Sequence, residues 1–308
     1  MRKSQFSGTS IQKAGVPKLG TISLDGSKVH ADASKHHAVS YKHLLKLESQ
    51  LRTEVEELLA RADQLEELGI SEGIARREAR LSQLAEAKVV LEAHAAERTA
   101  AEQAAYEEKL TQPSGSVLRG GRPPKPPVPG PRDEDQYDFT DPESRIMKNP
   151  TNTGFEQDYN VQVAVDQASL LIVGCALSNH PNDSQEAEPT LESIPSSAVG
   201  LPIAAALDAG YFGPATLTAC AKRGIEPYIA TARDPHHPSW LQRFTELSDP
   251  LPQDASAKVK MAYKLKAALG KAIYSLRKCT VEPVIGIIKE VLGFRQFSLR
   301  GLQAAAEE

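Results

Sequence analysis

The feature that most constrains the fold of this chain is a long segment with helical hydrophobic spacing, which separates two stretches with the spacing of strands. Between residues 41 and 68, apolar residues recur every three or four positions, and Glu, Arg and Lys fill the positions between them. This pattern predicts an amphipathic helix with an apolar stripe of the coiled-coil type. A second helical run, rich in Ala and Glu, extends over residues 74–110, and Gly69 and Gly73 mark a break between the two. We therefore predict a helical hairpin over residues 41–110.

The flanking stretches have the alternation of β-strands. In residues 18–34, Ile22 and Leu24 alternate with polar neighbours, and Asp25-Gly26 is a turn signal. After residue 137 short apolar runs alternate with helical patterns. Strands are predicted at 159–165, 170–177, 201–207 and 227–230, and helices at 184–194, 215–223 and from 257 onwards. This order predicts a mixed α/β sheet.

A Pro- and Gly-rich stretch follows the helical segment. Residues 111–136 read TQPSGSVLRGGRPPKPPVPGPRDEDQ, a composition typical of a linker without a packed core. We therefore predict four parts: an N-terminal segment with the first core strand (1–40), the helical hairpin (41–110), a linker (111–145) and the remainder of the α/β core (146–308).

The composition excludes several classes of protein. The chain has 308 residues and a net charge of −4, from 36 basic and 40 acidic residues, so it lacks the overall basic excess of many nucleic-acid binders. Its three cysteines are far apart and predict neither a disulfide framework nor a zinc site. No run reaches the roughly 20 apolar residues of a membrane span, and the N-terminus has no signal-peptide pattern. We expect a cytoplasmic protein with no membrane partner.

Three acids are candidates for a metal site. Asp25 and Asp208 each end an apolar strand-like run, and Glu282 is predicted to open a helix, with Pro283 in its first turn. Strand ends and helix starts are the places where α/β sheets gather site residues. Two Asp and one Glu suit Mg²⁺ or Mn²⁺ better than zinc, because these hard cations prefer oxygen ligands. Such a set could serve phosphoryl transfer with two metal ions.

Cationic and aromatic side chains surround the last of these acids. Tyr274 and Arg277 lie three residues apart, and Glu282 and Lys289 lie seven apart, so each pair shares a helix face. An Arg can bind a phosphate with two hydrogen bonds, and a Tyr can donate a further one. The alternative is an intrahelical Glu–Lys pair beside a buried Tyr. We predict that the segment binds a polyanion, such as the phosphate backbone of a nucleic acid, through Tyr274, Arg277, Lys289, Arg295 and Arg300.

Several motifs in this order resemble the DDE transposases of bacterial insertion sequences. They are DGSK at 25–28, DAGYF at 208–212, and Y-x2-R-x4-E-x6-K from Tyr274 to Lys289. YNVQVAVDQ (159–167) and SNHPNDS (178–184) are similar to the paired strands of that family and the turn that follows them. The resemblance covers roughly residues 18–40 and 140–303.

This resemblance implies a ribonuclease-H-like fold, with the helical hairpin inserted after the first strand. It implies Asp25, Asp208 and Glu282 as the catalytic, metal-binding triad, with Mg²⁺ or Mn²⁺ as the cofactor. The reaction would be cleavage at transposon ends followed by strand transfer, with transposon-end and target DNA as partners. Asp166 and Asp183 are additional acids, of which the resemblance places Asp166 in a turn.

The chain also departs from the family pattern. Only 24 residues precede Asp25, where relatives usually carry a helical domain that binds the DNA ends, so we expect a truncated form. The Arg-to-Glu gap is four residues rather than the commoner three, and Ser27 replaces the usual Thr. Two other functions stay open. The first is a non-catalytic protein that binds DNA or associates with itself, as a homo-oligomer, through the helical segment. The second is a ribonuclease-H-like nuclease.

Overall fold

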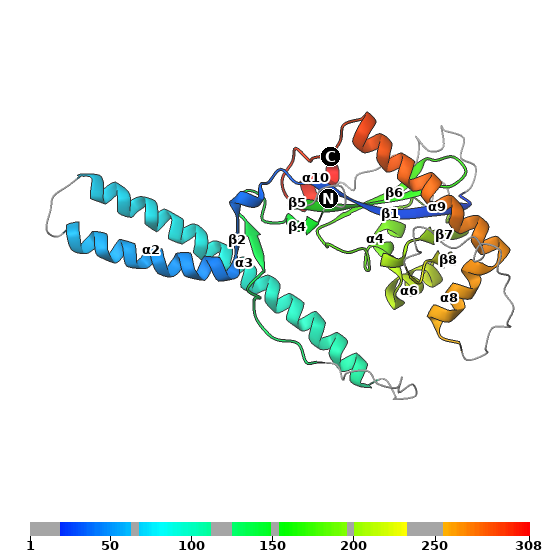
Figure 1. Cartoon of the computed structure of the whole chain (residues 1–308), viewed down its shortest axis with the longest axis horizontal. Helices are drawn as coiled ribbons and strands as arrows, with labels where there is room; N and C mark the ends of the chain where they lie inside the picture. The colour runs from blue at the N-terminus through cyan, green and yellow to red at the C-terminus, as the bar shows by residue number, and fades with distance from the viewer. Residues whose placement is uncertain (1–18, 63–67, 112–124, 149–153, 196–199, 233–254) are drawn as a thin grey trace. The chain divides into compact units, whose positions relative to one another are not determined.

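The computed structural model describes residues 19–62, 68–111, 125–148, 154–195, 200–232 and 255–308. The chain forms two compact units (Figure 1). The first combines residues 1–33 with 143–308, and the second is residues 34–142. Each unit is described by itself below.

A six-stranded mixed sheet forms the centre of the first unit. Its strands are β1 (Thr21–His30), β4 (Arg145–Lys148), β5 (Phe155–Asp166), β6 (Ile172–Ser178), β7 (Ala204–Leu207) and β8 (Glu226–Ile229). The order is β4-β5-β1-β7-β8, and β6 also pairs with β5. β5 is antiparallel to β1, β4 and β6, whereas β1, β7 and β8 run parallel to one another. The predicted mixed α/β class is therefore confirmed.

β1 lies between β5 and β7 and runs straight through Asp25 and Gly26, so the predicted turn there is wrong. Asp25 is opposite Val163 and Gly26 is opposite Gln162 in one continuous antiparallel register. The ladder with β5 fixes both residues in an extended conformation, which overrides the local turn preference. β1 consequently presents alternate residues to the two faces of the sheet.

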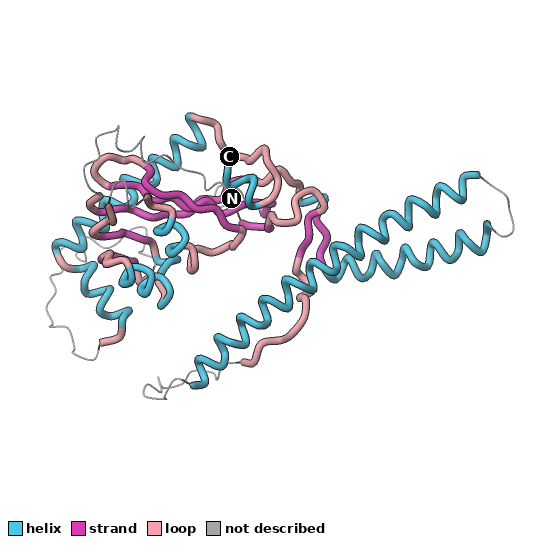
Figure 2. The backbone as a smooth tube through the Cα atoms, turned by 180° about the vertical axis from the view of Figure 1, so that it is seen from behind, coloured by secondary structure: helices cyan, strands magenta, loops and turns pink. Residues whose placement is uncertain are grey.

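Helices cover both faces of this sheet (Figures 1 and 2). On one face, α4 (Ala187–Glu192), α6 (Pro214–Lys222) and α8 (Ala257–Lys266) pack on apolar strand residues. This core includes Ile22, Leu24, Ala164, Leu191, Leu207, Cys220, Ile229 and Met261. On the other face, α9 (Ala268–Gly286) packs Val281 against Val163 and Val165 of β5. Ser23 and Asp25 of β1 belong to this second face.

α9 extends on both sides of Glu282, so the prediction that this acid opens a helix is wrong. Pro283 lies inside the helix, which continues to Gly286 and then into a π-helical turn, Ile287–Val291. A proline in a helix removes one backbone hydrogen bond and normally favours a break. Here the burial of Val281 and of neighbouring apolar residues against β5 stabilises the helix on both sides of the proline. A short helix, α10 (Leu302–Glu307), follows.

The second unit contains two long helices, α2 (Tyr41–Ala62) and α3 (Leu68–Thr111). Lys88 of α3 pairs with Glu48 of α2 at 3.2 Å, and Arg77 pairs with Glu54 at 2.7 Å. Later residues of α2 therefore meet earlier residues of α3, which makes the two helices antiparallel. The connecting residues 63–67 lie outside the described part of the chain.

The break predicted at Gly69 and Gly73 is wrong, because both glycines lie within α3. A glycine inside a helix costs only about 1 kcal/mol relative to alanine. The remainder of this 44-residue helix, packed along α2, outweighs that cost.

Part of the predicted linker is packed against these helices. β3 (Gln136–Asp138) pairs with β2 (Ala38–Ser40), which follows a 3-10 turn, Lys35–His37. Arg98 donates two hydrogen bonds to the carboxylate of Asp135, at 2.8 and 2.9 Å. Residues 112–124 lie outside the described residues.

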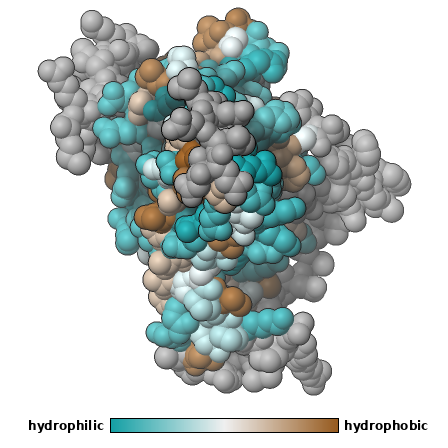
Figure 3. Space-filling view, turned by 90° about the vertical axis from the view of Figure 1, so that its left-hand side faces the viewer, coloured by the Kyte–Doolittle hydropathy of each residue, from teal (hydrophilic) through white to brown (hydrophobic). Residues whose placement is uncertain are grey.

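None of the helices in the described ranges combines the length and apolarity needed to cross a membrane. In the space-filling view, hydrophobic residues occur as separate spots among hydrophilic ones (Figure 3). Single exposed apolar side chains of this kind are normal for protein surfaces.

Candidate active site

Asp25 and Asp208 lie on neighbouring strands at the centre of the sheet. Ser23 of β1 is opposite Ala206 of β7 in the parallel register. Continuing this register by two residues places Asp25 opposite Asp208, which directly follows β7. Adjacent strands are separated by about 4.8 Å. The two carboxylates interact, since Asp208 contributes to the raised pKa of Asp25.

Asp25 is held in a partly buried ion pair with Arg277 of α9. Arg277 Nη1 donates to Asp25 Oδ2 at 2.8 Å, and the side chains are 7% and 20% exposed. Burial raises the pKa of Asp25, the positive charge of Arg277 lowers it, and the negative charge of Asp208 raises it, with a net increase. Among the described residues, no atom accepts a hydrogen bond from the buried Nε of Arg277. Arg277 therefore compensates the charge of one carboxylate, while its Nε donor has no partner in the part of the chain that the structure describes.

The side of α9 that faces the sheet is defined by Arg277, Thr280 and Val281. Thr280 Oγ1 donates to Ser23 Oγ at 2.7 Å, and Val281 is fully buried. Glu282 is exposed on the same helix. Five residues of helix turn it about 140° around the axis from Arg277, at about 100° per residue. The structure thus brings Asp25 and Asp208 together and leaves the carboxylate of Glu282 apart from them.

The other residues predicted to bind DNA have contacts within the chain. Lys289 Nζ donates to the backbone carbonyl of Lys28 at 2.6 Å. Arg295 pairs with Glu290 at 2.5 Å, and Arg300 pairs with Asp32 at 2.8 Å. The side chains of Arg295 and Arg300 are more than half exposed, so both guanidinium groups stay accessible. Tyr274 lies beside Arg277, whose guanidinium carbon is 5.9 Å from the centre of the ring.

Asp208 begins a tight turn that leads into a buried tyrosine. It caps the 3-10 turn Ala209–Tyr211 by accepting from the Gly210 N–H at 2.7 Å. The Tyr211 hydroxyl donates to Gln162 Oε1. Burial raises the pKa of Tyr211 well above its ordinary value, and the charges of Asp183, Asp25 and Asp208 raise it further. Tyr211 is therefore a neutral hydrogen-bond donor close to all three acids.

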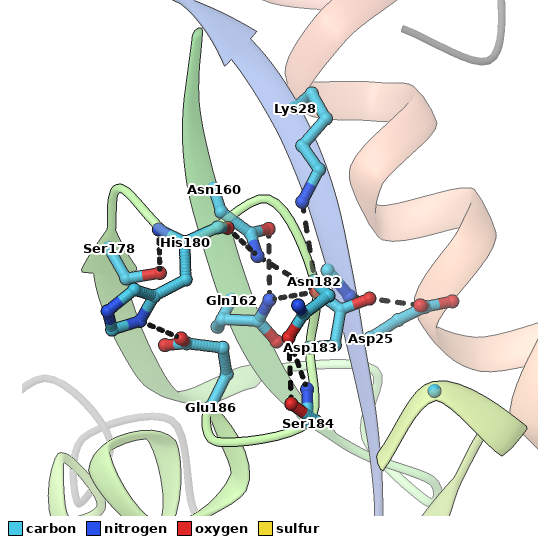
Figure 4. Close-up of polar contacts among 12 residues, drawn as sticks. Asp25, Lys28, Asn160, Gln162, Ser178, His180, Asn182, Asp183, Ser184 and Glu186 are labelled. Carbon is cyan, nitrogen blue, oxygen red and sulfur yellow. Dashed lines mark hydrogen bonds and ion pairs between the residues drawn. The ribbon is translucent and has the colours of Figure 1, made fainter. Parts of the chain in front are cut away.

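A second group of polar residues lies on the opposite face of β1 from the α9 helix (Figure 4). Its members are Lys28, Asn160, Gln162 and Asp183. The sequence marked Asp183 as an additional acid, but the two amides were missed. Asn160 and Gln162 alternate with valines in β5, which was their only signal, and both are fully buried.

The donor set fits a divalent cation in part. Asp25 and Asp208 supply hard oxygen atoms at neighbouring positions, as Mg²⁺ and Mn²⁺ require. Within the described ranges, no three His, Cys, Asp or Glu side chains are grouped so that they could hold a metal ion. The two aspartates fit, and Glu282 in its present orientation does not complete the set.

These features define a class: a mixed α/β protein with two interacting aspartates at the centre of its sheet and a cationic helix packed beside them. Residues 127–308 match the family model of the transposase DDE domain, so the chain belongs to this family of insertion-sequence transposases. The predicted resemblance is confirmed. No curated protein and no solved structure matches the chain.

The matched segment contains Asp208 and Glu282 but not Asp25. The structure joins Asp25 to it, because β1 lies between β5 and β7, both of which belong to the matched segment. Transposases of this family act on DNA and generally use divalent metals.

Proposed function

We propose that this protein is a DDE transposase with a ribonuclease-H-like core, which cleaves DNA at transposon ends and joins them to a target. Asp25 and Asp208 would hold the divalent cation, Mg²⁺ or Mn²⁺. Glu282 would be the third carboxylate, as its motif predicts, after a reorientation that brings it toward the pair. A bound cation supplies Lewis-acid activation of the phosphodiester and of the attacking oxygen.

One observation carries this proposal. β1, which lies outside the segment matched by the family model, is the central strand of the sheet, and its Asp25 lies opposite Asp208, which follows β7. Two carboxylates at neighbouring positions are costly unless a cation compensates their repulsion. In the described structure Arg277 supplies part of that compensation for Asp25.

The cationic side chains near the two aspartates and in the C-terminal segment would bind the phosphates of the DNA. The buried Nε of Arg277 has no hydrogen-bond acceptor among the described residues, which supports a role in binding a phosphate oxygen close to the aspartates. Arg295 and Arg300 are exposed and follow in the same C-terminal segment, where they could hold the DNA backbone. Lys289 is anchored on β1 through the carbonyl of Lys28, so its charge is fixed near the first aspartate strand.

The experiment is a cleavage and joining assay on duplex DNA that carries the genomic sequences flanking the reading frame, where the inverted repeats of an insertion sequence would lie. Wild-type protein is compared with Asp25→Asn, Asp208→Asn and Glu282→Gln in Mg²⁺, Mn²⁺ and EDTA. Glu192→Gln serves as the control, because Glu192 is an acid of the same unit with a side chain 61% exposed. We expect all three site variants to lose cleavage and the control to retain it.

Each outcome has a distinct meaning. Cleavage that persists in EDTA or in both aspartate variants would refute the proposed chemistry. Full activity in Glu282→Gln alone would remove this residue from the triad and leave the aspartate pair in place. Metal-dependent cutting without joining would favour a ribonuclease-H-like nuclease instead.

A further inference from the structure

Asp183 is the centre of a partly buried hydrogen-bond network on the face of the sheet opposite α9, and its own side chain is 26% exposed. Its Oδ1 accepts from Gln162 Nε2 at 2.8 Å and from Asn160 Nδ2 at 2.9 Å, and Lys28 Nζ lies 3.9 Å away. Both amide side chains come from β5 and are fully buried. Figure 4 shows Asp183 on a loop that brings its carboxylate up to these strand residues. Asp183 thus ties this loop to β1 and β5.

The two oxygens of Asp183 face the two glycines that accompany the candidate metal ligands. A Cβ atom on Gly26, the residue after Asp25, would lie 2.7 Å from Asp183 Oδ1. A Cβ atom on Gly210, two residues after Asp208, would lie 3.6 Å from Asp183 Oδ2. One carboxylate therefore lies close to the backbone that follows each aspartate, and the absence of a side chain on Gly26 makes room for it.

A second connection runs from Asp183 to the Asp208 turn through side chains. Gln162 donates to Asp183 with its amide nitrogen and accepts from the Tyr211 hydroxyl with its amide oxygen. Tyr211 is fully buried and ends the turn that Asp208 caps. The turn is consequently linked to Asp183 at Tyr211 through Gln162, and Gly210 lies close to the same carboxylate.

We propose that Asp183 is a positioning residue, which fixes the Asp208 turn relative to β1 and so sets the separation of Asp25 and Asp208. The inference rests on the proposed function, since it concerns how well the aspartate pair is arranged for a divalent cation. Asp183 acts through hydrogen bonds that its oxygen accepts, on the far side of β1 from the ion pair of Asp25 and Arg277. It does not itself bind the cation.

A positioning role for Asp183 predicts different effects for substitution by alanine and by asparagine. Asp183→Ala removes the acceptor for one N–H of each buried amide, which loosens the network. Asn160 keeps its hydrogen bond to the His180 carbonyl at 3.1 Å, and Gln162 keeps its bond to Asn160 Oδ1 at 3.0 Å. Asp183→Asn keeps a carbonyl oxygen that can accept from both amides. A positioning role therefore predicts a large effect for alanine and a small one for asparagine, whereas a ligand role would require the negative charge and make both variants defective.

The test measures Mn²⁺ binding to the full-length, metal-free protein by calorimetry, with hydrogen exchange of the peptide covering residues 208–212 as a second readout. We expect Asp183→Ala to weaken Mn²⁺ binding about 10- to 100-fold, the usual range for groups that orient metal ligands, and to speed exchange in that peptide. Asp183→Asn should stay within about threefold of wild type, because its oxygen preserves the network.

Asp166→Ala is the matched control, because Asp166 is a buried acid of β5 whose side chain caps its own turn at Ser169. It should leave Mn²⁺ affinity unchanged. If Asp183→Ala does not fold, Tyr211→Phe tests the same network by removing only the hydroxyl, and we expect a severalfold loss of affinity. Wild-type affinity in that variant would refute the inference.

The outcomes separate this inference from the proposed function. If Asp25→Asn and Asp208→Asn lose Mn²⁺ binding while Asp183→Ala binds normally, only the positioning role fails. If both aspartate variants bind Mn²⁺ like wild type, the proposed function itself fails. Equal losses in Asp183→Ala and Asp183→Asn would overturn the positioning role in favour of a required charge.

Discussion

Replacing Arg277 with methionine is expected to destabilise the first unit by about 3 kcal/mol at neutral pH. Methionine keeps an unbranched, mostly apolar side chain but removes the charge that compensates Asp25. Removing one partner of a buried ion pair costs about 3–5 kcal/mol, because the other charge is left without compensation. The Asp25 side chain is 20% exposed and the Arg277 side chain is 7% exposed, so water partly screens the remaining carboxylate. The cost is therefore expected at the lower end of that range.

The loss should depend on pH in a defined direction. Burial already raises the pKa of Asp25, and losing the positive charge of Arg277 raises it further. A carboxyl group whose pKa is higher in the folded state binds more protons there than in the unfolded state. Stability therefore falls as pH rises from about 4 through the folded pKa. This fall is larger in the variant, so its deficit relative to wild type is greatest near pH 7 and smallest near pH 4.

Urea unfolding at pH 4.5 and pH 7.5 measures this deficit. Because the chain forms two compact units, unfolding is followed by hydrogen exchange of peptides from β1 and β5 rather than by one global signal. Lys278→Met is the matched control, since Lys278 is the next residue and is exposed, and it should change stability by less than about 0.5 kcal/mol. A deficit that is equal at both pH values, or absent, would refute the argument.

Two further predictions concern other parts of the fold. Gly26→Ala should cost about 1–3 kcal/mol, because the added Cβ would clash with the side-chain amide nitrogen of the buried Gln162. Gly20→Ala, where no atom lies within 4 Å of the added Cβ, should be neutral in the same unfolding assay. In the second unit, burial alone would raise the pKa of Asp135, but the hydrogen bonds from Arg98 hold it below its ordinary value. Asp135→Asn should therefore cost about 1.5–3 kcal/mol at pH 7, measured by exchange in α2 and α3, and the cost should shrink as pH falls below about 4; an equal cost at pH 3 would contradict this reasoning.

Much of the sheet could be predicted from the sequence, because alternation records which residues face a core. Ile22 and Leu24 marked the buried face of β1, and the apolar run before Asp208 marked β7. The three- and four-residue strands β2, β3 and β4 have no pattern of their own, since pairing partners distant in sequence decide whether such short segments become strands.

The spacing of apolar residues in the sequence indicates how α9 is oriented, but the predicted helix start at Glu282 gives a different orientation. Arg277 and Val281 are four residues apart, and Val284 and Ile285 continue the same apolar face. That spacing places Arg277 toward the sheet and rotates Glu282 away from it. The predicted helix start at Glu282 obscured this, because a proline in the next position usually marks a first turn.

The burial of Asn160 and Gln162 could not be predicted. Polar residues that alternate with valines normally indicate a strand face in contact with water. In this protein the loop that carries Asp183 covers that face and provides an acceptor for both amides. Spacing within β5 contains no information about a loop some twenty residues further along the chain.

The position of β1 affects the order in which the protein can fold during synthesis. His30 of β1 and its partner Asp158 are separated by 128 residues, so the strand leaves the ribosome long before its neighbours exist. The helices of the second unit have mostly nearby partners and can assemble early. Until β5 emerges, the apolar residues of β1 have no sheet to pack in, and exposed apolar segments of this kind favour aggregation.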